Sequence, residues 1–444
     1  MGRELERIKK RLEKNPIKEC LAIQKKYYPT LFHMFDDVND PRNSSYVLYP
    51  NRVMLGTMYF KALGGISSMQ DMTRYFNDDK IVSNLYYFLG CKKKEYLPHY
   101  VTINEYLGNL APSELEKIQQ DMVYKMIRRK TFNDAKVAGK WLVIVDGTEL
   151  DEGLQKKNDN YLERCYHRGT DKEYTRYHRS VLEAKIYFGN NLIASIATEP
   201  IENEPGYSYR KMSDEKIKQD CESKAFIRLS EKLKKAFPRL PICILADGLY
   251  VSEKVINRCK EYNWSYIIRY KEGCASSIEE EYNAIPEKGC SGNAEFINGI
   301  IYKDSTVNVL KYTERKIVKG SEVITEFEWI TNIEITEKNA EKLAGAGRNR
   351  WKIENQGFNR QKQWQGNIEH ACSYNENAQK CHYLIEQIAD FIKQLYEYFF
   401  LKKNEIKKLQ KNISSDLLAS FGWQLTTEDI SVTQTSHINF NYAP

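Results

Sequence analysis

Three acidic residues have a type and a spacing suited to metal-dependent chemistry: Asp146, Asp247 and Glu354. Each aspartate follows a short apolar run, WLVIV or PICILA, and precedes a glycine. Such runs are typical of strands buried on both faces, and open sheets carry functional groups at the carboxyl ends of parallel strands. Because close carboxylates repel one another unless a cation intervenes, we predict that all three hold two Mg²⁺ ions, with Mn²⁺ as an alternative.

The segment around Glu354 reads GRNRWKIENQGFNRQK and predicts an amphipathic helix. Trp351 and Phe358 are expected to share its apolar stripe, and Arg350 lies one turn before Glu354 on a neighbouring face. An isolated Arg/Glu pair is usually a solvated surface pair. Here, however, charged residues are dense, and two apolar runs that each end in Asp-Gly precede the segment, which favours a functional role. Two metal ions can promote attack on a phosphodiester, so we predict that Arg350 and Lys362 contact DNA phosphates.

The composition indicates a globular and basic chain. Its 444 residues are 41% hydrophobic and 29% charged, which suits a large core with appendages. A formal net charge of +7 and an isoelectric point near 8.6 are compatible with a polyanionic partner. The ten cysteines form no CxxC pair, which favours a reducing compartment. With a charged start and no long apolar run, we expect no secretory signal and no membrane span, and hence a cytoplasmic, nucleoid-associated bacterial protein.

The chain divides by its sequence texture into five segments. Residues 1–135 are expected to be helical, with a break at Gly64 and Gly65 and an N-cap at Ser67 or Ser68, and form a candidate DNA-binding domain. The other expected segments are 136–271 for the first part of a catalytic core, 272–325 for a β-rich insertion, 326–400 for the second part with the Glu354 helix, and 401–444 for a C-terminal tail.

The first part of the core predicts a mixed α/β sheet. Its order is strand, hairpin, helix, strand, helix, strand, with parallel crossovers expected to be right-handed. We expect a polar loop over residues 149–179, a hairpin turn at residues 189–191 and a helix over residues 213–237. The fold class is therefore α/β, with helices flanking the sheet.

In this order the chain resembles a DDE transposase of the IS4 type. The resemblance covers residues 141 to about 375 and is carried by VIVDGT, CILADG and EWITNIEIT leading to RNRWKIENQGFNRQK, of which the last is the most specific. The N-terminal stretch DPRNSSYVLYPNRVMLGTMYFKALGGISSMQDMTRYF is also similar to the family. The resemblance implies a ribonuclease H-like core interrupted by a β-rich insertion. It also implies that Asp146, Asp247 and Glu354 bind the metal ions and that Arg350 is the family's arginine before the glutamate.

The family's activity is the function that the resemblance implies. A cut-and-paste transposase binds terminal inverted repeats in double-stranded DNA, hydrolyses the 3′ strand ends and joins them to target DNA using Mg²⁺. Cutting at both ends implies a homodimer assembled on DNA. Two other functions stay open: a non-catalytic DNA-binding descendant of a transposase, and a structure-specific nuclease on the same core.

Two positions depart from the family signature Tyr-x2-Arg-x3-Glu-x6-Lys. Gly347 stands where the tyrosine is expected, and Gln361 stands where the lysine is expected, with Lys362 one residue further on. An extra residue near Gly357, in a π-bulge, would absorb this slip.

Two groups of metal-ligand side chains are interpreted as structural. The spacing of Glu369, His370, Cys372, Cys381 and His382 fits no standard zinc pattern, so packing is the favoured reading. His167 and His178 are expected to be polar residues of the loop after Asp146.

Overall fold

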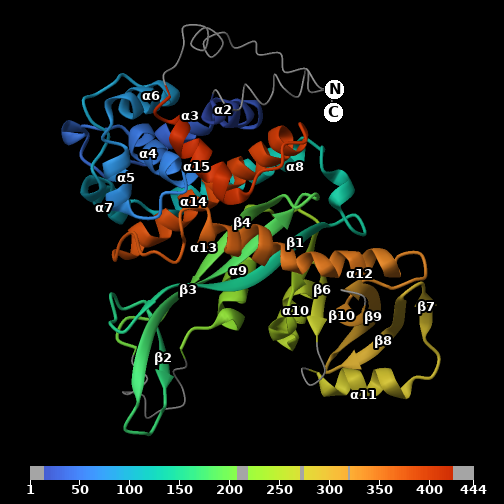
Figure 1. Cartoon of the computed structure of the whole chain (residues 1–444). Coiled ribbons are helices and arrows are strands. Elements are labelled where there is room, and N and C mark those ends of the chain that lie inside the picture. The colour runs from blue at the N-terminus through green and yellow to red at the C-terminus, as the bar shows by residue number, and fades with distance from the viewer. Residues whose placement is uncertain (1–14, 208–218, 271–274, 319–320, 424–444) are drawn as a thin grey trace.

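The computed structural model describes residues 15–207, 219–270, 275–318 and 321–423 of the 444-residue chain. In Figure 1, N-terminal and C-terminal helices lie together on one side of a long sheet, and the strands that follow β6 form a lobe at its far end. The start of the helix predicted over 213–237 lies outside the described residues. No described helix has the length and apolar character needed to cross a membrane.

Ten strands form one mixed sheet. Five of them lie side by side in the order β4, β3, β1, β5, β6. Their bounds are β1 Trp141–Gly153, β3 Tyr174–Tyr187, β4 Ile193–Ile201, β5 Ile242–Ala246 and β6 Ser265–Tyr270. The first three are antiparallel neighbours, whereas β1, β5 and β6 are parallel. This arrangement confirms the predicted α/β class and the hairpin, whose turn has Gly189, Asn190 and Asn191 at positive φ.

Burial on both faces explains why the two apolar runs form central strands. Along β1, Trp141, Val143 and Val145 belong to one hydrophobic cluster, whereas Leu142 and Ile144 belong to another. Side chains alternate between the faces of a strand, so each face of β1 meets its own core. The same alternation holds along β5.

The predicted loop over residues 149–179 is wrong. β1 continues past Asp146 and Gly147 to Gly153, because β3 pairs with it antiparallel as far as Gly153 opposite Tyr177. β2, Leu162–Tyr166, adds a third strand beside β3. These strands extend away from the core as a ribbon (Figure 1). Most side chains of the ribbon are intermediate between buried and exposed, so it lacks the alternating apolar pattern that marks a strand with one buried face.

The lobe beyond β6 consists of one helix and four strands: α11 Ser276–Ala284, β7 Gly289–Ser291, β8 Ala294–Tyr302, β9 Ser305–Val318 and β10 Ser321–Thr331. The strands fit the predicted β-rich segment, but α11 was not predicted. β10 pairs antiparallel with β6, so the lobe continues the core sheet rather than forming a separate sheet.

Helices from both ends of the chain pack together above the sheet (Figure 1). The N-terminal ones are α2 Pro16–Tyr27, α3 Leu31–Asp36, α4 Asn51–Leu63, α5 Met69–Tyr75, α6 Asp79–Leu89, α7 Tyr100–Asn109 and α8 Pro112–Arg128. Ser68 caps α5 by accepting a hydrogen bond from the Asp71 N–H, as predicted. The C-terminal helix α14, Glu376–Tyr396, packs against α2, α4, α7 and α8. One hydrophobic cluster therefore includes these helices and one face of the sheet.

The expected C-terminal tail contains regular structure. After α14 come a π-helical turn, η7 Glu397–Lys402, and a further helix, α15 Gln410–Ser420. α15 packs against α2 and α4 through Ile413 and Leu417, which are buried. Its apolar residues are few, which is why the sequence pattern missed it. Residues 424–444 of the predicted tail lie outside the described residues.

Candidate active site

Two strands in register carry Asp146 and Asp247, the first within β1 and the second directly after β5. Parallel pairing sets Ile144 of β1 opposite Leu245 of β5, and each aspartate comes two residues later. Both aspartates fall on the alternation that faces the second hydrophobic cluster. Asp247 ends its strand by accepting a hydrogen bond from the Leu249 N–H at 3.0 Å, which caps the short helix η4, Gly248–Tyr250. The pairing therefore sets the two carboxylates at neighbouring positions on one face of the sheet.

Arg350 reaches the Asp146 carboxylate. Its Nη1 donates to Asp146 Oδ2 at 3.0 Å, while the Gly147 N–H donates to Oδ1 at 3.0 Å. The Arg350 side chain is only 10% exposed and that of Asp146 19%, so the ion pair is largely desolvated. Arg350 Nε is buried without a hydrogen-bond partner among the described residues. The guanidinium thus places positive charge against the predicted metal ligand Asp146.

Glu222 is a further acidic residue at this site, and the sequence patterns did not reveal it. It begins α9, Glu222–Ala236, the helix that leads into β5. A side chain on Gly147 would overlap with the Glu222 carboxylate, so that group lies directly against the backbone after Asp146. Tyr250 of η4 donates its hydroxyl to Glu222 Oε2 at 2.8 Å. The one sequence signal for this approach is Gly147, because only a glycine leaves room for it.

Burial and neighbouring charges raise the pKa values of Asp146 and Glu222. Burial raises the pKa of Asp146 to about 7; the Arg350 charge opposes this rise, and the charges of Asp247 and Glu222 add to it. Burial also raises the pKa of Glu222, against the hydrogen bond from Tyr250 and with a contribution from Asp247. The carboxyl groups of Asp146, Asp247 and Glu222 therefore share one electrostatic environment beside the middle of β1 and the end of β5.

The predicted Glu354 helix is a series of short helical turns. α12, Ala340–Arg348, leads into the 3-10 turn η5, Asn349–Trp351, the π-helix η6, Ile353–Phe358, and α13, Asn359–Gln363. η5 contacts β1 and β5, and η6 contacts β1 and β4. The π-helix contains Gly357, which confirms the predicted extra residue.

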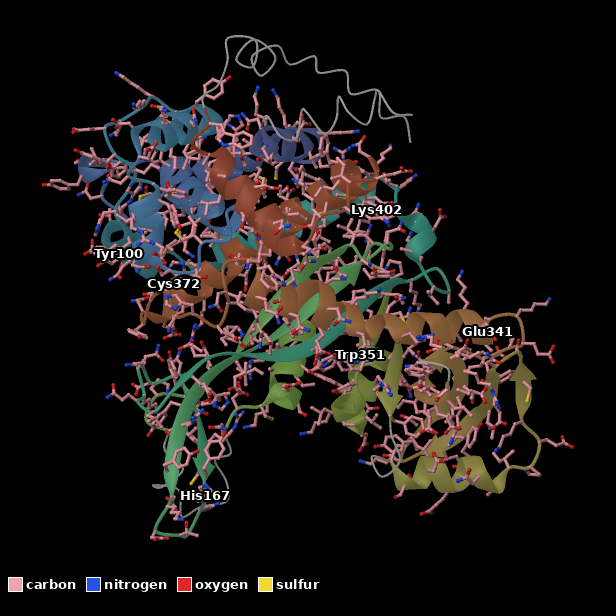
Figure 2. All side chains as sticks on the ribbon, in the orientation of Figure 1. Tyr100, His167, Glu341, Trp351, Cys372 and Lys402 are labelled. Atoms are coloured by element: carbon pink, nitrogen blue, oxygen red, sulfur yellow. The ribbon has the colours of Figure 1, made fainter. Side chains whose placement is uncertain are left out.

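The apolar stripe of this segment differs from the prediction. Phe358 is buried, but Trp351 is 43% exposed and projects from the segment (Figure 2). Ile353 takes the buried position instead, because the helical period changes from one turn to the next.

Both departures from the family signature have a packing reason. A Cβ on Gly347 would lie 2.5 Å from the indole of Trp329, which is buried, so this helix position has no room for a tyrosine. Gln361 is fully buried and donates to Gln387 Oε1 at 2.8 Å and to Asp390 Oδ2 at 2.9 Å. A lysine at position 361 would put another charge into this buried polar network.

Neither of the remaining predicted site residues, Glu354 and Lys362, forms a hydrogen bond or an ion pair with Asp146 or Asp247. Glu354 is partly exposed, and no hydrogen bond or ion pair to another described residue holds its carboxylate. Lys362 forms an ion pair with Glu369 at 2.8 Å. The structure thus brings together Asp146, Asp247 and Arg350 and adds Glu222, while Glu354 lies on a turn packed against β1.

The donor chemistry of this site suits a hard divalent cation. Asp146, Asp247, Glu222 and Glu354 offer carboxylate oxygens, the ligands that Mg²⁺ prefers. Among the described residues, no group of three His, Cys, Asp or Glu side chains is arranged to hold a metal ion. The Cys and His residues between 370 and 382 therefore form no such group either. A cation at Asp146 would share that carboxylate with Arg350, which contacts only Oδ2.

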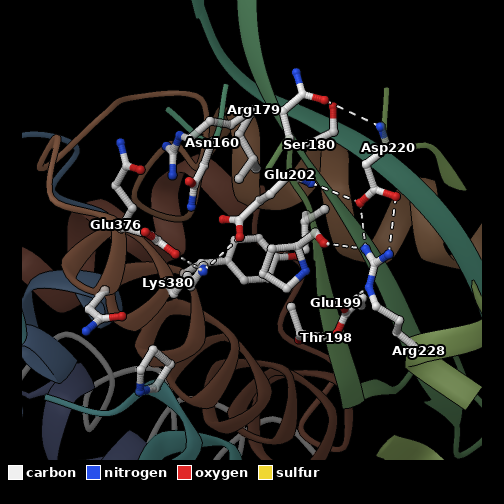
Figure 3. A pocket seen from close by; sticks show the side chains of 18 of the residues that line it. Asn160, Arg179, Ser180, Thr198, Glu199, Glu202, Asp220, Arg228, Glu376 and Lys380 are labelled. Atoms are coloured by element: carbon white, nitrogen blue, oxygen red, sulfur yellow. Dashed lines mark hydrogen bonds and ion pairs between the residues drawn. The ribbon is translucent and has the colours of Figure 1, made fainter. Parts of the chain in front are cut away.

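A separate cavity of about 1100 Å³ lies between α8, α9, β4 and α14 (Figure 3). Its charged side chains pair with one another. Arg228 bonds Asp220 and Glu199, and Lys380 bonds Glu202 and Glu376. None of the predicted catalytic residues lines it, so we do not assign the active site to this cavity.

Residues 219–389 match a family model described as the transposase DDE domain. The matched range contains Asp247, Arg350 and Glu354, and it begins just before Glu222. No curated protein matches the chain. The match supports a DDE transposase, and hence an enzyme of transposition, for this α/β chain.

Proposed function

We propose that this protein is the transposase of an insertion sequence of the IS4 type, which cuts the ends of its element and joins them to target DNA. The observation that carries the proposal is the register of β1 and β5, in which Asp146 and Asp247 each stand two residues beyond the paired positions Ile144 and Leu245. The family match over residues 219–389 supports the same class.

We propose a ribonuclease H-like core for the catalytic domain. The strand order β4, β3, β1, β5, β6 supports it, in which β4, β3 and β1 are antiparallel and β1, β5 and β6 are parallel. The strands β7–β10 between β6 and the Glu354 segment support the IS4 type, as does the WKIEN motif.

In this proposal Asp146, Asp247 and Glu354 hold two Mg²⁺ ions, or Mn²⁺, and Glu222 is a further acidic neighbour. Bound there, the two ions would activate a water or a 3′-hydroxyl and stabilise the leaving oxygen of a phosphodiester. Glu354 has no competing bond to another described residue, and its turn η6 packs against β1, so its carboxylate is available for this role.

The protein's own cations would position the DNA strand. Arg350 compensates the charge of Asp146 through its 3.0 Å contact. Its remaining N–H groups would donate hydrogen bonds to a DNA phosphate near the cutting site. Lys362 is paired with Glu369 on the exposed side of α13 and is proposed to make a second phosphate contact. The partners are double-stranded DNA with terminal inverted repeats, target DNA and a second copy of the chain, in the bacterial cytoplasm.

Strand cutting tests this function. Duplexes that carry the inverted repeats flanking the reading frame should be nicked at their 3′ strand ends by the wild type in Mg²⁺, but not in EDTA and not by Asp247→Ala. Asp159→Ala, which removes an exposed acid from the ribbon, is the matched control and should cut normally.

Each outcome of this assay selects one function. Equal cutting by wild type and Asp247→Ala would contradict the proposed metal-dependent mechanism. Specific binding without any cutting would indicate a non-catalytic descendant, and cutting without joining to target DNA would indicate a nuclease.

A further inference from the structure

A groove of about 1200 Å³ lies at the end of the sheet where β1 begins. Its walls come from α2, the connection between α8 and β1, the turn between β3 and β4, the α12–η5 segment and η7. Segments far apart in the sequence therefore enclose one surface. Figure 2 labels Lys402, one of the lining residues, near the ribbon of α12.

The charge of this groove is one-sided. Among the described residues that line it, the basic ones outnumber the acidic ones by six to one. The basic residues are Lys26, Arg129, Lys136, Lys342, Lys402 and Lys403, and the acidic residue is Asp134. The cavity of Figure 3 differs in composition, because acidic residues line it together with its basic ones. A concave surface lined by one sign of charge concentrates its field on a polyanion.

Like charges in the groove act on one another. The pKa of Lys26 is lowered, first by burial and then by the neighbouring charges of Lys403 and Arg129. These side chains therefore lie close enough to act on one another's charge, and an anionic partner would favour their charged forms.

Aromatic rings and backbone carbonyls hold the basic side chains in place. Arg129 lies 4.9 Å from the centre of the Tyr27 ring and donates to the Lys26 carbonyl at 2.9 Å. Lys136 lies 4.9 Å from the ring centre of Trp141, and Lys402 lies 5.4 Å from that of Tyr398. Cation–π contacts leave the ammonium groups charged and able to bond a phosphate.

We propose that this groove binds the phosphate backbone of duplex DNA at a place distinct from the carboxylate site. None of the acidic residues of the candidate active site lines it, but Asn349, which directly precedes Arg350, does. The groove therefore reaches the other side of the η5 turn that carries Arg350. The choice of DNA as the polyanion rests on the proposed function, whereas the site itself rests on the charge and shape of the groove.

The salt dependence of DNA binding tests the groove directly. The variant Lys136→Gln/Lys342→Gln/Lys402→Gln removes three cations from the lining. The control Lys235→Gln/Lys260→Gln/Lys338→Gln removes three exposed lysines that line none of the four cavities. Binding of a fluorescent duplex carrying the terminal repeats is measured by anisotropy between 50 and 200 mM salt, with far-UV circular dichroism to confirm folding.

Each phosphate contact contributes about 0.9 to the slope of log K against log salt, so the groove variant should lose about 2.7 from this slope. Over a fourfold rise in salt the wild type should then weaken about 40-fold more than the variant. A slope equal to that of the wild type, or the same loss in the control, would overturn the proposal, and so would an effect seen with duplex RNA but not with DNA. DNA cutting by Asp247→Ala is measured separately. A result against the groove proposal is therefore distinguishable from a result against the proposed active site.

Discussion

The pKa of Asp146 predicts how divalent ions bind as the pH changes. Burial raises this pKa to about 7, so the carboxyl is mostly protonated at pH 6 and mostly ionised at pH 8. A metal ion requires the ionised form and must displace the proton. Affinity for Mg²⁺ or Mn²⁺ should therefore rise between pH 6 and 8 and level off above pH 8.

The size of the change follows from the fraction ionised. With a pKa of about 7, about one Asp146 carboxyl in eleven is ionised at pH 6 and about ten in eleven at pH 8, so the dissociation constant should be about tenfold weaker at pH 6. Binding at pH 6 should also release about 0.9 of a proton, against about 0.1 at pH 8.

Isothermal titration of the full chain with Mn²⁺, in two buffers of different ionisation enthalpy, measures both quantities. Asp146→Asn should bind weakly at both pH values, because its amide does not titrate. Asp159→Asn, an exposed substitution of the same kind, should behave as the wild type. Equal wild-type affinity at pH 6 and pH 8, or a pH dependence retained in Asp146→Asn, would refute the reasoning.

Two substitutions test the packing that supports the Glu354 segment. Gly347→Ala should lower the free energy of unfolding by about 1–3 kcal/mol, because its Cβ would overlap the buried Trp329 indole; an unchanged urea midpoint would contradict this. Arg360→Met should cost about 3–5 kcal/mol, because Arg360 pairs with two carboxylates in the core. The control Arg74→Met breaks an exposed ion pair and should cost about 0–1 kcal/mol, so equal losses in the two variants would contradict the prediction.

The central strands and their aspartates were predictable because they are buried on both faces. Such strands read as short continuous apolar runs, and Asp146 and Asp247 mark the places where functional groups follow them. The π-helix at Gly357 was predictable for another reason. The spacing between Glu354 and Lys362 is one residue longer than in the family signature, and a helix can accommodate an extra residue as a π-bulge.

Other features left no local signal. Glu222 begins an ordinary polar helix, and only the packing of α9 against Gly147 brings it to the site. Most side chains of the β2–β3 ribbon are only partly buried, so its sequence lacks an apolar alternation and resembles a loop. Trp351 seemed to be a core residue because the prediction assumed one helical period throughout, whereas the segment changes from 3-10 to π geometry.

Glu354 gives the most direct test of the proposed catalytic centre, because its turn must bring it to Asp146 and Asp247. The single-turnover rate of 3′ strand cutting in Mg²⁺ is measured for Glu354→Gln, for Asp247→Asn and for the double variant, with Glu337→Gln as the exposed control. The effects of substituting residues that hold the same two metal ions should not add. Each single variant should cut at a near-background rate, and the double variant should be no slower than either. Normal cutting by Glu354→Gln would contradict the proposed metal site.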